Sequence, residues 1–208
     1  MTDPQQSGEE SAKDFFFNVK SEKGWRLSNL VGPRGAIPQC LYEATKFAQP
    51  EVKEVFFGLD QLSDEQFRIM YKHLSGKQAD FWYMEGKPIY GILAKMLGRA
   101  AYDESYAPIL QQLAGVSYLE VNEPLSPKEQ AQMMLRCMKN KYKHPGYRGY
   151  LLTGKNCVIH EKPIRGSPNM WTLDPQTRKG NDLTGLLLMY VMQACLDAEE
   201  ASSQTSAT

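Results

Sequence analysis

A long irregular segment near the end of the sequence limits most strongly how this chain can fold. Residues 161–180 contain three prolines, two glycines and a single tryptophan, which disfavours both helix and strand. Short apolar runs at 150–153 and 157–160 flank Gly154 and predict a β-hairpin before this loop. After the loop, a buried helix is predicted from apolar residues at helical spacing: Leu183, Leu186, Leu187, Tyr190, Val191 and Ala194. We therefore expect a functional loop held between a hairpin and a core helix.

Helices are predicted over most of the remaining chain. Pro38 is placed to open one, and two capping boxes, Ser63 with Gln66 and Ser126 with Glu129, predict helices over about 64–74 and 127–142. Further helices are predicted from Pro88 to residue 100 and over 106–113, and strands over 15–19, 25–30 and 116–121. The pattern indicates a mostly helical α+β domain over 14–197, with a small sheet built from distant segments. Polar, small residues predict disordered tails at 1–13 and 198–208.

Composition excludes several broad classes of protein. With 208 residues, 42% of them hydrophobic, one sizeable core is favoured over two small ones. Lys and Arg together number 24, as do Asp and Glu, so no overall charge attracts nucleic acid or an anionic membrane. No apolar run approaches the roughly 20 residues that a membrane helix needs, and the polar start is unlike a signal peptide.

The cysteines indicate a reducing compartment, so we expect a cytoplasmic or nuclear protein. They are scattered, form no CxxC pair and make no metal-like grouping with histidine. The four cysteines and three histidines are Cys40, Cys137, Cys157, Cys195, His73, His144 and His160. No metal site or cofactor is expected.

Lys46 is the sharpest candidate for a reactive side chain. It precedes the apolar Phe47, and partial burial would leave its amine free for carbonyl chemistry. The alternative is a surface ion pair with Glu43, which is three residues earlier on the same helix. Gln39, Glu43 and Lys46 lie at i, i+4 and i+7 and so share one side of that helix.

Other polar candidates each have a structural alternative. Trp171 could stack on a base or sugar, or it could close the core. Glu161, just after a predicted strand, could act as acid or base or lie exposed. The Gly180-Asn181 pair could bind phosphate through backbone N–H groups, or it could form a turn and helix cap. Arg99 could bind phosphate or form a structural salt bridge.

Several short segments occur in an order that matches a known family. They are LSN at 27–29, ATKF at 44–47, AKMLGR at 94–99, Met134 with KY at 141–142, LLTG at 151–154, Glu161, Trp171, and NDL at 181–183 leading into LLM at 187–189. Together they resemble the NADAR family, the YbiA-like N-glycosidases, from about residue 15 to residue 194.

The resemblance implies a NADAR-like α+β fold and cleavage of an N-glycosidic bond. The implied reaction either removes ADP-ribose from guanine in nucleic acid or hydrolyses an early riboflavin-pathway intermediate. Lys46 matches the family lysine that attacks the anomeric carbon as a Schiff base. Ser28, Asn29 and Trp171 match positions that line the family pocket. ADP-ribose or ADP-ribosylated nucleic acid is thus the expected partner, and Gln39, Arg99 and Asn181 are further candidates for binding it.

The sequence departs from the family just before the lysine. The family has Glu-His where this chain has Gln39 and Cys40, and an uncharged amide cannot serve as a general base. One hypothesis is an active, divergent glycosidase in which Glu43 or Glu161 works with Lys46. The other is a pseudoenzyme that binds ADP-ribose without cleaving it. In both, Lys46, Trp171, Asn29 and Asn181 are expected to converge on one pocket.

Overall fold

The structure, a computed structural model, describes residues 12–164 and 169–205 and is mostly helical. Its α-helices are α1 (Pro38–Ala44), α2 (Pro50–Gly58), α3 (Asp64–Ser75), α4 (Gly91–Leu97), α5 (Ala107–Ala114), α6 (Pro127–Lys141), α7 (Pro145–Leu152) and α8 (Leu183–Thr205). Its strands are β1 (Lys13–Phe17), β2 (Tyr83–Met84), β3 (Lys87–Pro88) and β4 (Cys157–Glu161). Short 3₁₀ helices cover Trp25–Leu27, Leu59–Gln61, Asp80–Trp82 and Gly98–Ala101. An α+β fold is therefore confirmed at this coarse level.

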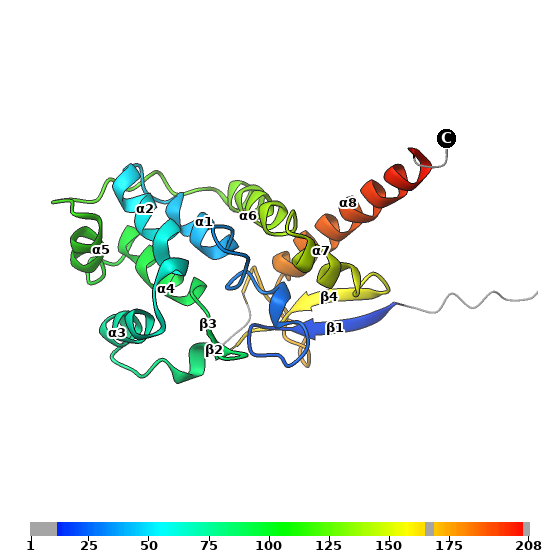
Figure 1. The fold of residues 1–208 in the computed structure, drawn as a ribbon, viewed down its shortest axis with the longest axis horizontal. Helices are drawn as coiled ribbons and strands as arrows, with labels where there is room; N and C mark the ends of the chain where they lie inside the picture. Colours follow the sequence, from blue (N-terminus) through cyan, green and yellow to red (C-terminus); the bar gives the residue numbers. More distant parts are fainter. Residues whose placement is uncertain (1–11, 165–168, 206–208) are drawn as a thin grey trace, which may run out of the picture.

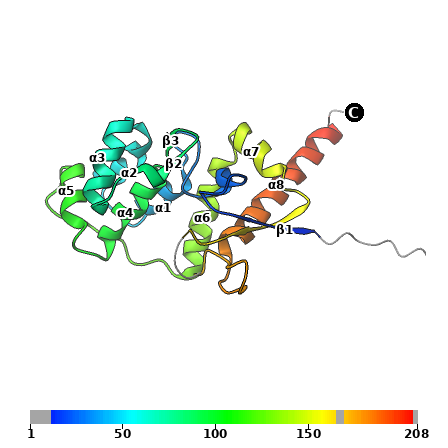
Figure 2. The same cartoon turned by 90° about the horizontal axis from the view of Figure 1, so that it is seen from below.

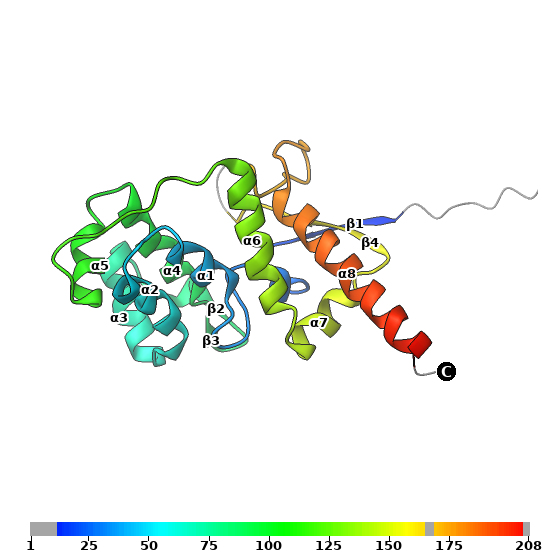
Figure 3. The ribbon, with the colours of Figure 1, turned by 90° about the horizontal axis from the view of Figure 1, so that it is seen from above.

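The helices form two groups, with α6 between them. Helices α1 to α5 gather at one end of the molecule, and β1, β4, α7 and α8 lie at the other (Figures 1 and 2). Seen from above, α6 lies between α1 and α8, and it contacts both (Figure 3). No described helix is both long enough and apolar enough to cross a membrane.

Two apolar cores match these two groups. The first surrounds Phe47, Phe56, Phe67 and Leu93 in the α1–α5 group, and all four side chains are fully buried. The second joins the sheet to α6, α7 and α8: Phe17, Met138, Leu151, Ile159 and Leu188. Helix α1 contributes Cys40 and Ala44 to the first core, while Leu41 and Tyr42 pack against the second. Polar residues on α1 are therefore held between the two cores.

Strands β1 and β4 pair in parallel, from Lys13 opposite Cys157 to Phe17 opposite Glu161. Parallel strands need a crossover connection, and here it contains α1 to α7. A small sheet built from distant segments was expected, and this pair confirms it. Strands β2 and β3 form a separate antiparallel hairpin.

Both predicted capping boxes are confirmed. Ser63 caps α3 and Ser126 caps α6, each accepting a hydrogen bond from the backbone N–H three residues later. In return, the side chains of Gln66 and Glu129 bind the backbone N–H of the capping serine. Such reciprocal bonds satisfy donors that a helix start would otherwise leave unpaired.

Several predicted elements are wrong. Residues 150–152 end α7 rather than forming a hairpin strand, so β4 pairs with β1 instead. Residues 25–27 form a 3₁₀ helix rather than a strand, and Pro88 lies in β3, ahead of the start of α4 at Gly91. In the segment 116–121 only Val121 pairs, through a bridge to Phe47. Helices α2 and α7 were not predicted.

Helix α8 is present as predicted, but a different face is buried. Leu186 is 61% exposed and Tyr190 57% exposed, whereas Thr184, Leu188 and Met192 are buried. Of the predicted stripe, Val191 alone is buried. The helix also continues to Thr205, so residues 198–205 are helical where a disordered tail was expected. Of the two predicted tails, residues 1–11 and 206–208 lie outside the described part of the chain.

Candidate functional site

A cavity of about 200 Å³ lies where the loop after β4 meets α1, α4 and α8. We call it the Trp171 cavity. Four of the predicted site residues line it, namely Asn29, Gln39, Glu161 and Trp171. The unpredicted lining residues with polar side chains include Lys95, Lys162, Asn169, Thr172 and Thr184. The structure therefore brings together three amide side chains, a carboxyl group, an aromatic ring and two lysines.

The start of α8 holds the loop that carries Trp171. The Leu183 N–H donates to Met170 O at 2.9 Å, and the Thr184 N–H donates to Trp171 O at 3.2 Å. The Asn181 N–H donates to Asn169 O at 3.2 Å. Of the two N–H groups predicted to bind phosphate, that of Asn181 is thus used by the protein's own loop. Asn181 is exposed and does not line the cavity, so its expected place in the pocket is wrong.

A buried carboxylate fixes β4 against α8. Asp182 Oδ2 lies 2.6 Å from His160 Nδ1, and Asp182 Oδ1 accepts the Glu161 N–H at 3.1 Å. His160 Nε2 lies 3.1 Å from Asp14 Oδ1 on β1. A Cβ atom on Gly185 would overlap the Asp182 carboxylate and Ile159 O, so glycine permits this close approach. Glu161, at the end of β4, is thereby held at the cavity wall.

The Glu161 carboxyl group is set to exchange protons near neutral pH. Burial raises its pKa from the ordinary value of 4.5 to about 7. The Thr184 hydroxyl and the positive charges of Lys95 and Lys141 oppose this rise, while Asp182 adds to it. A carboxyl group with this pKa in a cavity is a candidate for general acid–base catalysis.

The LSN segment contributes one lining residue. Asn29 is 7% exposed, and its Oδ1 atom has no hydrogen-bond partner among the described residues. Its neighbour Ser28 is buried and does not line the cavity, although a place in the pocket was expected. Ser28 Oγ accepts the Leu30 N–H, and Ser28 O accepts a bond from Lys141 Nζ at 2.9 Å. Ser28 thus fixes the backbone beside Asn29.

Gln39 and Glu43 lie on α1, but Lys46 lies just past the end of this helix at Ala44 rather than on it as expected, and the three side chains still form a chain of contacts. Gln39 Nε2 donates to Glu43 Oε1 at 2.6 Å, and Lys46 Nζ lies 2.5 Å from Glu43 Oε2. Glu43 is only 3% exposed, and its carboxylate occupies the space that a side chain on Gly98 would fill. Burial raises the pKa of Glu43, while Lys46, Gln39 and Lys95 oppose the rise. The ion pair foreseen between Glu43 and Lys46 is therefore present.

Lys46 lines a different cavity from Trp171. This second space, of about 370 Å³, also includes Tyr42, Tyr102 and Asn122, and we call it the Lys46 cavity. Lys46 Nζ lies 5.9 Å from the Tyr42 ring centroid, and the same ring meets Trp171 edge-on at 6.1 Å. Tyr42 therefore contacts both residues. The expectation that Lys46 and Trp171 share one pocket is not met.

The remaining candidate, Arg99, has only structural contacts in the described part of the chain. Arg99 is exposed, donates to Tyr106 Oη at 3.1 Å and lines none of the described cavities. Cys40 is buried in the first core, and burial raises the pKa of its thiol, which disfavours a nucleophilic thiolate. In the described part of the chain, no group of His, Cys, Asp and Glu could hold a metal ion.

Sequence patterns carried some signal for the residues that were missed. Lys95 is the single charged residue of the otherwise apolar α4, yet its side chain reaches the Trp171 cavity. Lys141 continues the buried stripe of Met134, Cys137 and Met138 and is itself fully buried. Burial holds the pKa of Lys141 well below its ordinary value, and Glu161 opposes this effect. A lysine in a buried apolar stripe is rare without a partner, so Lys141 was a detectable anomaly, whereas Lys95 occupies an exposed position of α4 that carries no such signal.

No family model, curated protein or solved structure matches the chain. Function has to be inferred from the chemistry of the cavities and their contacts.

Proposed function

We propose that this protein hydrolyses the N-glycosidic bond of a ribosyl substrate in the Trp171 cavity. The proposed substrates are ADP-ribosylated guanine in nucleic acid or a ribosylamine of the riboflavin pathway. The proposal rests chiefly on Glu161, whose pKa of about 7 places a proton donor and acceptor beside Trp171 and Asn29. The resemblance to the NADAR family supports the same reaction class, and a NADAR-like fold is part of the proposal.

Glu161 can serve both halves of such a hydrolysis. At neutral pH about half of these carboxyl groups carry a proton, because the pKa is about 7. The protonated form gives its proton to the leaving nitrogen as the bond from that nitrogen to the anomeric carbon breaks. A water oxygen then bonds to the anomeric carbon, and its proton passes to the Glu161 carboxylate. The carboxyl group is thereby restored, and no further reactant is consumed.

The other lining groups suit a ribosyl phosphate. Asn29 Oδ1, buried and without a protein donor in the described structure, can accept a bond from a ribose hydroxyl. Lys95 and Lys162 bring two positive charges to the lining, which favours phosphate. The Trp171 ring offers a face for a base or sugar. Each group therefore has a complementary part in ADP-ribose.

Lys46 belongs to an alternative route through a Schiff base. Its amine would bond to the anomeric carbon as the bond to the leaving nitrogen breaks and that nitrogen takes up a proton; opening of the ribose ring would give the imine, and water would later hydrolyse the imine to free the amine. To do so the amine has to leave Glu43 and reach past Tyr42, because Lys46 lines the adjacent cavity. Borohydride added during turnover would reduce such an imine to a stable adduct on Lys46. Mass spectrometry should find that adduct in the wild type and not in Lys46→Ala.

A second candidate function is binding of ADP-ribose without cleavage. The pairing of Lys46 with Glu43 and the amide of Gln39 at the cavity wall favour it, since neither supplies a free nucleophile or base there. Gln39→Glu would restore a carboxyl group to this wall. If an adduct on Lys46 or release of product appears only in that variant, the protein is a lapsed enzyme with an intact pocket.

The decisive test uses the full chain and a guanine oligonucleotide carrying ADP-ribose. Release of free ADP-ribose, followed by chromatography, is the expected result. Glu161→Gln should slow release by about 10²- to 10⁴-fold, the usual range for a positioned acid or base. Glu54→Gln, an exposed glutamate of α2, is the matched control. Release at an unchanged rate in Glu161→Gln would disprove the role of Glu161. Binding without release would favour the second candidate.

A further inference from the structure

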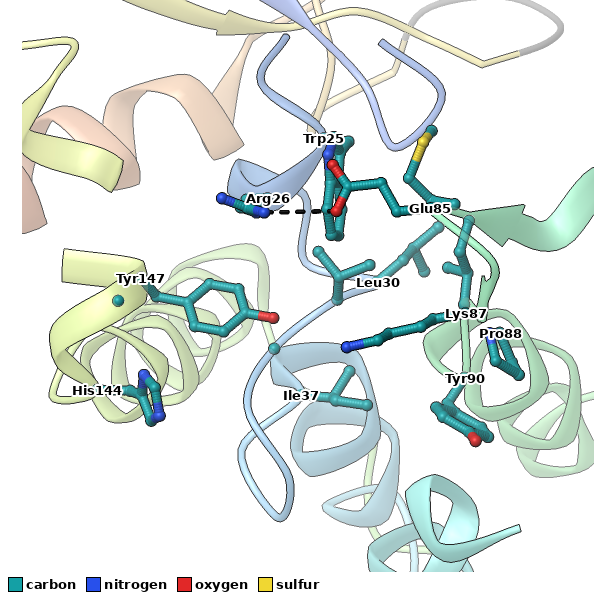
Figure 4. A pocket seen from close by; sticks show the side chains of 15 residues that line it. Trp25, Arg26, Leu30, Ile37, Glu85, Lys87, Pro88, Tyr90, His144 and Tyr147 are labelled. Atoms are coloured by element: carbon teal, nitrogen blue, oxygen red, sulfur yellow. Dashed lines mark hydrogen bonds and ion pairs between the residues drawn. The ribbon is translucent and has the colours of Figure 1, made fainter. Parts of the chain in front are cut away.

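A third cavity, of about 350 Å³, lies apart from the two already described (Figure 4). We call it the Trp25 cavity. It forms between the 3₁₀ helix Trp25–Leu27, the β2–β3 hairpin and the start of α7. Leu30 also lines the Trp171 cavity, and every other lining residue differs. Its volume falls within the range of small-molecule sites.

The walls of this cavity suit a flat ring. Leu30 and Ile37 supply aliphatic surface, while Trp25 and Tyr147 present aromatic side chains toward the same space (Figure 4). Trp25 and Tyr147 come from segments more than 100 residues apart. Aromatic side chains prefer offset-stacked or edge-on contacts with a second ring, and such pairs add to the energy of apolar burial. A ligand here is expected to be planar and aromatic.

The charges at the rim leave one positive charge without a partner. Arg26 Nη2 lies 3.4 Å from Glu85 Oε2, so these two charges compensate each other. Lys87 has no ion pair or side-chain hydrogen bond to any residue in the described ranges. Its ammonium group extends across the cavity toward Tyr147 (Figure 4). A single free ammonium group matches a ligand with one negative charge better than a dianionic phosphate.

A second donor stands opposite Lys87. The Tyr147 hydroxyl points into the same space, and no hydrogen bond to it occurs within the described part of the chain (Figure 4). An ammonium and a hydroxyl group facing each other can each donate to one oxygen of a carboxylate. The two donors therefore select the orientation of the carboxylate as well as its negative charge.

The hairpin that carries Lys87 has a tight, defined turn. Glu85 and Gly86 have φ angles of 49° and 74°, both in the left-handed region, and Met84 pairs with Lys87 across the turn. Two successive left-handed residues are typical of two-residue hairpin turns that match the twist of their strands. The turn thus fixes the backbone positions from which Glu85 and Lys87 extend to the rim.

We propose that the Trp25 cavity binds a small aromatic carboxylate of one or two fused rings. The ring lies among Trp25, Tyr147 and Leu30, and the carboxylate accepts hydrogen bonds from Lys87 Nζ and Tyr147 Oη. This site is independent of the Trp171 cavity and of the glycosidase proposal.

The ligand class is tested with indole-3-carboxylate titrated into the full chain and followed by NMR. Saturable binding is expected, with the neutral indole-3-carboxamide and the non-aromatic acetate each binding at least about tenfold more weakly, because each lacks one half of the recognised pair. Equal affinity for the carboxamide, or absence of binding at about 1 mM carboxylate, would overturn the proposal. Preference for guanosine monophosphate would also overturn it, in favour of a nucleotide site.

Matched variants locate the site. Lys87→Gln removes the positive charge, with a side chain one bond shorter, and should weaken indole-3-carboxylate binding about tenfold or more, because the charge-assisted hydrogen bond is lost. Tyr147→Phe keeps the ring and should weaken it about fivefold. Lys77→Gln, an exposed lysine away from the cavity, should leave affinity unchanged. If Lys87→Gln folds normally by circular dichroism and binds like Lys77→Gln, the carboxylate is not held by Lys87 and the site is wrong.

Discussion

Replacing Glu161 with glutamine should stabilise the folded protein above neutral pH, even though it removes the proposed catalytic group. The cause is burial. In the folded protein the ionised carboxylate has lost part of its hydration, and this loss raises its pKa to about 7. Glutamine keeps the size of the side chain and, like the protonated carboxyl group, has one carbonyl oxygen and a donor, but it never carries the charge. The variant therefore removes an energetic cost that the wild type bears only when Glu161 is ionised.

The size of the effect follows from linkage. The folded pKa of about 7 lies about 2.5 above the ordinary value of 4.5, and each pH unit corresponds to 1.36 kcal/mol. Between these values the folded state holds more protons than the unfolded state, so wild-type stability falls as pH rises. The loss begins near pH 4.5 and is complete above pH 7, where it reaches about 3 kcal/mol. Glu161→Gln should escape this loss.

Urea unfolding at about pH 4.5 and pH 8.5 measures the difference directly. The variant and the wild type should be similarly stable at the lower pH, and the variant should be more stable by about 3 kcal/mol at the higher pH. For a chain of this length that gain corresponds to a rise in Tm of about 6–12 °C. Glu54→Gln, which removes a carboxylate from the exposed side of α2, should show no such dependence.

Two results would refute this reasoning. If the stability difference is the same at both pH values, the folded pKa of Glu161 is not raised. If Glu161→Gln is the less stable protein at pH 8.5, the ionised carboxylate is stabilised by Lys95 and Lys141 more than it is penalised by burial. Either outcome would also remove the main support for Glu161 as an acid–base group.

Three further predictions address other contacts. Gly98→Ala should destabilise the protein by about 1–3 kcal/mol in urea unfolding, because its Cβ would overlap Glu43 Oε2 and displace a buried carboxylate; stability equal to wild type would contradict this. Trp171→Ala should weaken ADP-ribose binding about 10- to 100-fold by calorimetry, through loss of stacking; unchanged affinity would assign Trp171 to the core alone. The hydrogen bond from His160 holds the pKa of Asp14 below its ordinary value, so Asp14→Asn should lower thermal stability at neutral pH. The difference in stability between variant and wild type should vanish as the pH falls through that lowered pKa. A difference that persists in acid would exclude this ionic contribution.

Sequence signals that depend on neighbouring residues predicted the helix starts well. The capping boxes at Ser63 and Ser126 depend on residues three apart, and both mark true helix starts. The face of α8 was mispredicted because Leu186, Leu187 and Leu188 are consecutive and supply apolar surface in every direction. The close contact of Gly185 with β4 determines which face of α8 is buried. Because β4 is remote in sequence, the sequence of the helix alone does not reveal this contact. Residues 150–152 form helix for a similar reason, since α7 packs on α8 in the second core.

The site was predictable in part. Asn29, Gln39, Glu161 and Trp171 were named from sequence and line one cavity. The raised pKa of Glu161 was not foreseeable, because it arises from burial by segments that are remote in sequence. The position of Lys46 depends on Tyr42, whose ring is placed by packing between the cores rather than by any motif.

The pairing of β1 with β4 makes the order of chain synthesis important. Lys13 finds its partner only at Cys157, after all of the α1–α5 group has been made. At about 5–20 residues per second, the first strand waits roughly 7–30 s before β4 is synthesised. During this interval Phe15, Phe16 and Phe17 have no sheet partner. An apolar strand in that state is a target for chaperones and for pairing with other nascent chains, so we expect the yield of folded protein to depend on how quickly synthesis is completed.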